Sequence, residues 1–190
     1  MRLPFTRSPR RAHARLLALL LALVCGTMTA VPAAVSAERE HTLKAGFLVN
    51  FSQFTTWPHQ AFTSPRSPFV VGIIGPDPFG STLDAVVDGV DVGGHRIEIR
   101  RLLTGDEVRH CHVLFVGPMN GRELKRMIDL VGSAPVLTVG EGPAFLDAGG
   151  MVAFRVENNR VRFDVNVIAA RRAGLTLSSE MLQFARVVTP

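Results

Sequence analysis

Two alternating apolar stretches, separated by a pair of asparagines, constrain the fold of this chain more than any other feature. Residues 152–156 and 161–167 place an apolar side chain at every second position, which is typical of half-buried β-strands. Asn158 and Asn159 stand between them, and asparagine tolerates the positive φ that a two-residue primed turn requires. The sequence therefore predicts a β-hairpin with its turn at these two residues.

Because side chains alternate between the two faces of a strand, this turn also fixes which residues lie opposite each other. One predicted face is wholly apolar and carries the pairs Val152–Val165, Phe154–Phe163 and Val156–Val161. The other face is mostly polar and carries the pairs Ala153–Asp164, Arg155–Arg162 and Glu157–Arg160. Arg155 opposite Arg162 is an unfavourable like-charge pair unless an anion, an acidic partner or the diagonal Asp164 relieves it.

The polar face and the residues that follow it form the candidate binding surface of this chain. Arginine is a residue that protein interfaces favour, which supports a partner or ligand surface. Ordinary solvation of a polar face is the simpler interpretation, and the sequence leaves both open. The residues predicted to bind a partner or ligand are Arg155, Arg162, Asp164, Asn166, Arg171 and Arg172.

Strands and helices alternate along the rest of the chain. Apolar runs at 69–74 and 113–116 predict buried strands, and two further strands are predicted at 96–102 and 135–139. Such alternation indicates an α/β fold. We expect a mixed, largely parallel sheet with flanking helices and a C-terminal β-hairpin plus helix.

The predicted helices have recognisable faces and ends. They lie at 40–55, 79–87 and 120–131, and two short helices follow the hairpin. Gly174 suits the end of the first short helix and Ser178 the start of the second. The helix at 40–55 shows one apolar stripe at helical spacing, formed by Leu43, Phe47, Phe51 and Phe54.

Residues 1–37 are predicted to be a secretory signal peptide, and residues 38–190 a single α/β domain. Five arginines and no acidic residue accompany the apolar stretch 16–24, and small residues at 35–37 offer a cleavage point. That stretch is shorter than the roughly 20 residues of a membrane span. Cys25 would suit a lipoprotein signal, but a bulky valine precedes it where such signals prefer glycine or alanine. We therefore expect ordinary export.

Removal of residues 1–37 changes the charge and the cysteine content. The whole sequence holds 21 basic and 16 acidic residues, and the loss of five arginines leaves 16 of each. A neutral chain has no electrostatic footprint for nucleic acid. Only Cys111 remains, so no intramolecular disulfide is expected. A buried, inert thiol is the simplest interpretation, and a reactive or intermolecular thiol is the alternative.

Two segments carry residue types that could bind a cofactor or a metal. The turn at 72–80 connects a strand to a helix, but its two prolines remove N–H donors that a phosphate would need. A turn capped by Asp77 is expected there instead. His110 and His112 would share one face of a strand, but two ligands are too few for a zinc site. No cofactor, metal site or catalytic residue is predicted.

Short segments spread over the chain occur in an order that resembles the YfiR-like family of bacterial periplasmic proteins. They lie at 44–51, Trp57-Pro58, 71–75, 77–80, 111–115, 136–139, 149–154, 161–166 and 173–179. The resemblance covers about residues 42–188. It implies a periplasmic regulatory protein without catalytic residues to carry over. Some members carry cysteine pairs and are associated with redox control, which is not expected of a chain with one remaining cysteine.

The best-understood role of that family is inhibition of a membrane-bound diguanylate cyclase through its periplasmic portion. The resemblance therefore implies that this protein binds such a cyclase, or a related sensor protein, and lowers cyclic-di-GMP signalling. The alternative is a periplasmic sensor module that binds a small molecule. A homodimer also stays open.

Overall fold

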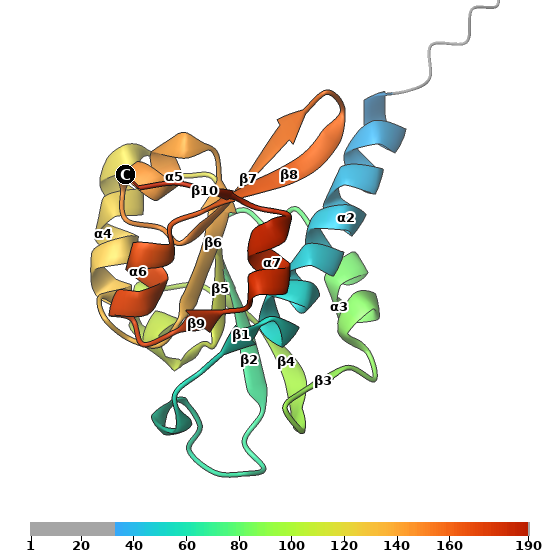
Figure 1. The fold of residues 1–190 in the computed structure, drawn as a ribbon. Coiled ribbons are helices and arrows are strands. Elements are labelled where there is room, and N and C mark those ends of the chain that lie inside the picture. Colours follow the sequence, from blue (N-terminus) through green and yellow to red (C-terminus); the bar gives the residue numbers. More distant parts are fainter. Residues whose placement is uncertain (1–32, 190) are drawn as a thin grey trace, which may run out of the picture. The chain divides into compact units, whose positions relative to one another are not determined.

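The chain forms an eight-stranded sheet. Figure 1 shows helices packed on both of its faces. The computed structural model describes residues 33–189, and the predicted signal peptide lies almost entirely outside them. In chain order the elements are α2 (Ala33–Gln53), β1 (Thr55–Thr56), η1 (His59–Ala61), β2 (Phe69–Ile74), α3 (Ser81–Val87), β3 (Asp91–Val92), β4 (His95–Leu102), η2 (Gly105–His110), β5 (Val113–Val116), α4 (Gly121–Val131), β6 (Leu137–Glu141), α5 (Pro143–Asp147), β7 (Val152–Glu157), β8 (Arg160–Val165), α6 (Val167–Arg172), β9 (Thr176–Leu177), α7 (Ser179–Gln183) and β10 (Arg186–Val187).

The sheet is mostly parallel, and the chain adds strands first on one side of β2 and then on the other. Its strand order is β10-β8-β7-β6-β5-β2-β4-β3. β2 pairs in parallel with β4 on one side and with β5 on the other, and the parallel pairing continues through β6 to β7. The hairpin pair β7–β8 and the edge pair β3–β4 are antiparallel. The predicted mixed, largely parallel sheet with a C-terminal hairpin is confirmed.

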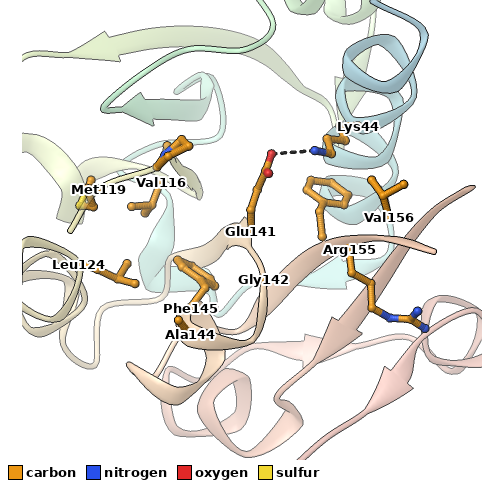
Figure 2. Close-up of a pocket in the computed structure, with 13 residues that line it drawn as sticks. Lys44, Val116, Met119, Leu124, Glu141, Gly142, Ala144, Phe145, Arg155 and Val156 are labelled. Atoms are coloured by element: carbon orange, nitrogen blue, oxygen red, sulfur yellow. Dashed lines mark hydrogen bonds and ion pairs between the residues drawn. The ribbon is translucent and has the colours of Figure 1, made fainter. Parts of the chain in front are cut away.

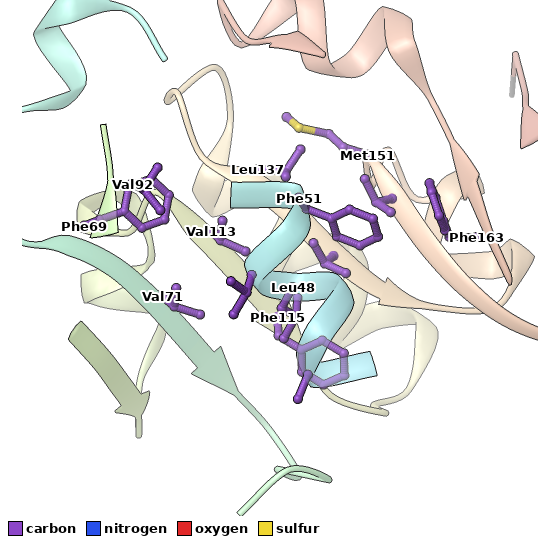
Figure 3. Packing of buried hydrophobic residues seen from close by; sticks show 14 of the residues in the cluster. Leu48, Phe51, Phe69, Val71, Val92, Val113, Phe115, Leu137, Met151 and Phe163 are labelled. Carbon is purple, nitrogen blue, oxygen red and sulfur yellow. The ribbon is translucent and has the colours of Figure 1, made fainter. Parts of the chain in front are cut away.

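Each face of the sheet is covered by its own group of apolar residues. On β2, Phe69 belongs to the group covered by α2 and α3, and Val70 to the group covered by α4 and α5. All the residues of β2 are buried, as expected of a parallel strand covered on both faces. Figure 3 shows the first group, in which Phe51 of α2 and Phe115 of β5 both take part.

α2 packs on the sheet through a face that differs in part from the predicted stripe. Phe47 and Phe51 point toward the hairpin, where the Phe51 ring lies 4.9 Å from that of Phe163. Leu43 and Phe54, the two ends of the stripe, are 55% and 37% exposed, so that part of the prediction is wrong. A helix that lies on a wide sheet buries a broader face than a single stripe. The other buried residues of this face are Lys44, Ala45, Leu48, Val49 and Ser52.

The hairpin has the predicted register at every pair from Val152–Val165 to Glu157–Arg160. Asn158 and Asn159 have φ values of 51° and 58°, which are those of a primed two-residue turn. Its apolar face is buried only at the base, because Phe154 is 1% exposed whereas Val156 near the tip is 52% exposed. β6 ends opposite Phe154, so the hairpin continues beyond its neighbouring strand (Figure 1).

The segment after the hairpin contains the predicted helix ends and two strands that were not predicted. Ser178 Oγ accepts a hydrogen bond from the Met181 N–H at 3.1 Å, and Gly174 has a φ of 73°. β9 pairs with β1, and β10 pairs in parallel with β8. Strands of two residues are too short to show an alternating pattern, so the sequence did not reveal them. β10 nevertheless places Arg186 beside Asp164.

Candidate functional site

The predicted surface on the hairpin contains a buried carboxylate between two arginines. Asp164 is 4% exposed. Its Oδ1 accepts a hydrogen bond from Arg155 Nε at 2.8 Å, and its Oδ2 accepts one from the guanidinium of Arg186 on β10. A buried carboxylate needs such partners, because an unpaired charge loses its hydration without compensation. The like-charge contact between Arg155 and Arg162 is therefore relieved within the chain by the diagonal Asp164.

Arg160 and Arg162 are exposed on the same face, as is Arg186. Among residues 37–189 neither of the first two forms an ion pair, whereas Arg155 pairs with both Asp164 and Glu157. The face thus carries the four arginines Arg155, Arg160, Arg162 and Arg186 against the two carboxylates of Glu157 and Asp164. It is positive overall, and its surplus charge lies toward the hairpin tip.

The other three predicted site residues lie elsewhere or have a structural role. Asn166 is 7% exposed and caps α6, since its side-chain oxygen accepts a hydrogen bond from the Ala169 N–H at 2.9 Å. Arg171 and Arg172 occupy the exposed last turn of α6, where a positive charge suits the helix dipole. In the described part of the chain no hydrogen bond or ion pair joins them to the hairpin. Binding by any of the six residues stays a prediction.

A cavity of about 540 Å³ opens beside the hairpin, at the carboxyl ends of β5 and β6. β6 extends to Glu141, beyond the predicted end at 139, and the chain then turns through Gly142 with a φ of 74°. Figure 2 shows its walls, which come from the loops after β5 and β6, from β7 and from α2. The side chains that line it include Lys44, Met119, Leu124, Glu141, Phe145, Phe154, Arg155 and Val156.

Lys44 on α2 is the buried charge of this cavity. Its side chain is 3% exposed, and its Nζ lies 2.6 Å from Glu40 Oε1 and 2.7 Å from Glu141 Oε1. Burial alone would lower the pKa of Lys44, but the hydrogen bonds to Glu141 and Glu40 outweigh it and raise the pKa. Lys44 therefore stays charged, and it ties α2 to the end of β6. The ammonium also lies 5.9 Å from the centre of the Phe154 ring.

Sequence reasoning missed this cavity because its key contact joins distant residues. Glu40 and Lys44 are four positions apart, a spacing that already predicts a helical ion pair. Glu141 is 97 positions from Lys44, and nothing in the local pattern of either residue indicates the other. The location itself follows a rule, because α/β sheets bind ligands outside the carboxyl ends of their strands, near the point where the winding direction changes. Here that point lies between β2 and β5, and the cavity lies one strand away from it, at the ends of β5 and β6.

The segment 110–112, considered above for metal binding, has a packing role. His110 ends η2 and is exposed, whereas His112 is 6% exposed, so the two do not lie together on a strand. His112 Nδ1 accepts a hydrogen bond from the Val70 N–H at 2.9 Å, and its Nε2 lies 3.1 Å from the Ala61 oxygen. The ring is therefore neutral and carries its proton on Nε2. Burial, chiefly, lowers the pKa of His112 to about 4.

Cys111 is a buried thiol, in agreement with the simpler of the two interpretations. It is 5% exposed, and burial raises its pKa to about 11. Gly72 makes room for it, since a Cβ at that position would lie 2.4 Å from Cys111 Sγ. Within the described residues no group of three or more metal-ligating side chains comes together.

The protein is a doubly wound α/β domain with a cavity at the carboxyl ends of its strands, the place where ligand sites occur in such folds. The chain matches the YfiR/HmsC-like family over residues 41–186, which is more than half of its length. The protein therefore belongs to the YfiR/HmsC-like family, and the resemblance seen in the sequence is confirmed. Across residues 33–189 no helix is both long and apolar enough to span a membrane.

Two solved structures match part of this chain in a structural comparison. The first is a conserved domain protein from Vibrio cholerae O1 biovar El Tor, which is 12% identical with a TM-score of 0.47 over 64% of this chain and 55% of that one. The second is the ABC domain from Streptococcus pneumoniae in complex with L-Trp, which is 12% identical with a TM-score of 0.48 over 76% of this chain and 60% of that one. The chain thus spans between 55% and 60% of the length of these two structures.

Proposed function

We propose that this protein is a periplasmic regulator that binds and inhibits the periplasmic portion of a membrane-bound diguanylate cyclase or a related sensor protein. Its membership of the YfiR/HmsC-like family over residues 41–186 carries this proposal. The leader-like composition of residues 1–37 supports export. Binding holds the partner in its inactive state and lowers cyclic-di-GMP output.

Inhibition requires a preference for the inactive state of the partner. To shift an equilibrium from 99:1 to 1:99, the inhibitor must bind one state about 10⁴-fold more tightly, which is roughly 5.5 kcal/mol. A standard interface buries about 800 Å² on each partner, and a few residues carry most of its binding free energy. A domain of this size offers enough surface for one such interface.

The outer face of the hairpin tip is the surface we assign to the partner. Arg160 and Arg162 are exposed there and lack ion-pair partners among the described residues, so they are available to an acidic surface. Val156 on the opposite face of the tip is 52% exposed and adds an apolar contact. Asp164 serves instead to hold Arg155 and Arg186 in place.

The experiment compares Arg162→Glu with Arg96→Glu, its matched control. Both arginines are exposed on strands, but Arg96 lies on β4, at the other side of the sheet. Arg162→Glu should relieve inhibition and raise the cyclic-di-GMP level while protein abundance stays normal, because it reverses a charge at the interface without touching the core. Arg96→Glu should repress normally. Unchanged repression by both Arg162→Glu and Arg160→Glu would move the interface away from the hairpin.

A second candidate function is that of a sensor module whose small ligand tunes the partner. The cavity beside the hairpin favours it, since its volume of about 540 Å³ lies within the range of small-molecule sites, roughly 300–1,000 Å³. Arg155 and Val156 belong both to the hairpin and to the wall of the cavity. A ligand there contacts β7, which pairs with β8, the strand that carries Arg160 and Arg162 of the proposed interface.

A further inference from the structure

The cavity beside the hairpin carries an unbalanced charge. One ammonium, that of Lys44, faces the two carboxylates of Glu40 and Glu141. The nearby Arg155 does not correct this imbalance, because Arg155 and Arg186 are already matched by Glu157 and Asp164. The cluster of Lys44, Glu40 and Glu141 beside the cavity therefore carries a net negative charge.

Glu141 is the carboxylate that can meet a ligand. It lines the cavity, whereas Glu40 does not, and its side chain is 38% exposed. Its Oε1 holds Lys44, and among the described residues its Oε2 has no hydrogen-bond partner. A carboxylate oxygen accepts strong hydrogen bonds from an ammonium. Lys44 is a poorer site for an anionic ligand, because the anion would be a third negative group beside Glu40 and Glu141.

Apart from Lys44, Glu141 and Arg155, the residues that line the cavity are apolar. Met119, Leu124 and Phe145 lie on one side, and Val156 of β7 lies on the other (Figure 2). Phe154 of β7 also lines the cavity. Aromatic faces also attract cations, as the position of Lys44 over the Phe154 ring shows. A ligand that fits this lining has one positive group and an apolar body.

We propose that the cavity at the carboxyl ends of β5 and β6 binds a small organic cation, an amine whose ammonium pairs with Glu141 and whose apolar body packs against Phe145 and Met119. This inference deepens the second candidate function by naming the ligand class. It can be tested independently of the proposed docking to a cyclase, because ligand binding to the cavity is measured on the isolated protein.

The test compares three probes of similar size and different charge. 2-Phenylethylammonium is the cation, 2-phenylethanol the neutral probe and 3-phenylpropionate the anion. Each is titrated into the ¹⁵N-labelled protein, and the backbone amide signals of Gly142 and Val156 are followed. The cation should bind about tenfold more tightly than the alcohol, since a hydrogen bond to a charged group is stronger by that factor. The anion should bind most weakly.

Two variants test whether the probes bind in this cavity. Glu141→Gln should remove the tenfold preference for the cation, and the fold should persist because Lys44 keeps Glu40. Ala144→Trp should abolish binding of all three probes, since it fills the cavity from the exposed start of α5. Glu98→Gln is the matched control, because Glu98 pairs with Arg100 on β4, away from the cavity, and it should bind like the unaltered protein.

The outcomes that overturn the proposal are equally defined. They are tightest binding of 3-phenylpropionate, equal binding of all three probes, or a cation preference that survives in Glu141→Gln. Absence of binding by any probe also overturns it. Normal repression by Arg162→Glu, in contrast, would count against the proposed interface alone.

Discussion

Replacing Phe163 with alanine tests whether the hairpin and α2 form one aromatic core. Phe163 is 3% exposed, and its ring lies 4.9 Å from that of Phe51 and 5.5 Å from that of Phe47. We expect Phe163→Ala to lower the free energy of unfolding by about 3–5 kcal/mol, because a buried ring is lost and a cavity is left. The edge-on contact with Phe51 places the loss toward the upper end, since such pairs add about 0.5–1.5 kcal/mol.

Val161→Ala is the matched control for this change. Val161 lies on the same strand and the same face, but it is only half-buried and faces the exposed Val156. Its truncation removes little buried surface, so the expected loss is about 1 kcal/mol or less. Because domains of this kind are stable by only about 5–15 kcal/mol, Phe163→Ala alone should also reduce the amount of folded protein.

Urea unfolding, followed through the fluorescence of the one tryptophan, measures both variants. Trp57 is 8% exposed, and its indole N–H donates to the His112 oxygen at 3.2 Å, so its emission reports on the folded core. The midpoint should fall while the slope with urea stays constant. A loss below about 1.5 kcal/mol in Phe163→Ala, or equal losses in the two variants, would refute the reasoning.

Three further predictions concern Cys111, His112 and the arginines near Asp164. Cys111→Ala should leave regulation intact and cost about 1 kcal/mol of stability; with a pKa near 11 the thiol should react with maleimide only when the protein unfolds, and rapid labelling at pH 7 would contradict this. His112 has a folded pKa of about 4, below its ordinary 6.5, so an unfolded chain takes up its proton first as the pH falls. The stability from this group is complete above pH 6.5 and declines toward pH 4, by at most about 3 kcal/mol; urea unfolding at pH 7 and 4.5 should show a smaller decline in His112→Gln. Arg155→Glu should cost about 1–3 kcal/mol, because it sets a carboxylate beside the buried Asp164, and Arg162→Glu should cost almost nothing; equal midpoints would disprove this.

The sequence predicted those parts of the fold that depend on local patterns. The register of the hairpin follows from Asn158 and Asn159 and from strict alternation. The buried strand β2 follows from a run of apolar residues, and the start of α7 follows from the hydroxyl of Ser178. Each of these features is determined within a few residues.

The candidate site was only partly predictable, because its contacts are set by tertiary packing. The diagonal relief of Arg155 by Asp164 could be derived from the register, but Arg186 could not, since β10 is too short to leave a pattern. The rotation of α2 that buries Lys44 depends on the sheet beneath it. Its pairing with Glu141 depends on where β6 ends.

The first helix of the domain has its partners near the end of the chain. Lys44 reaches Glu141 over 97 positions, and Phe47 and Phe51 pack against Phe163. Closing loops of this length is slow, because the chain must be ordered before the contacts stabilise it. A chain that is still being synthesised therefore cannot complete this core until β8 is present. A fragment that stops before β8 leaves the apolar face of α2 exposed to chaperones and proteases. The core of α2 is thus completed only by a chain that extends at least to β8.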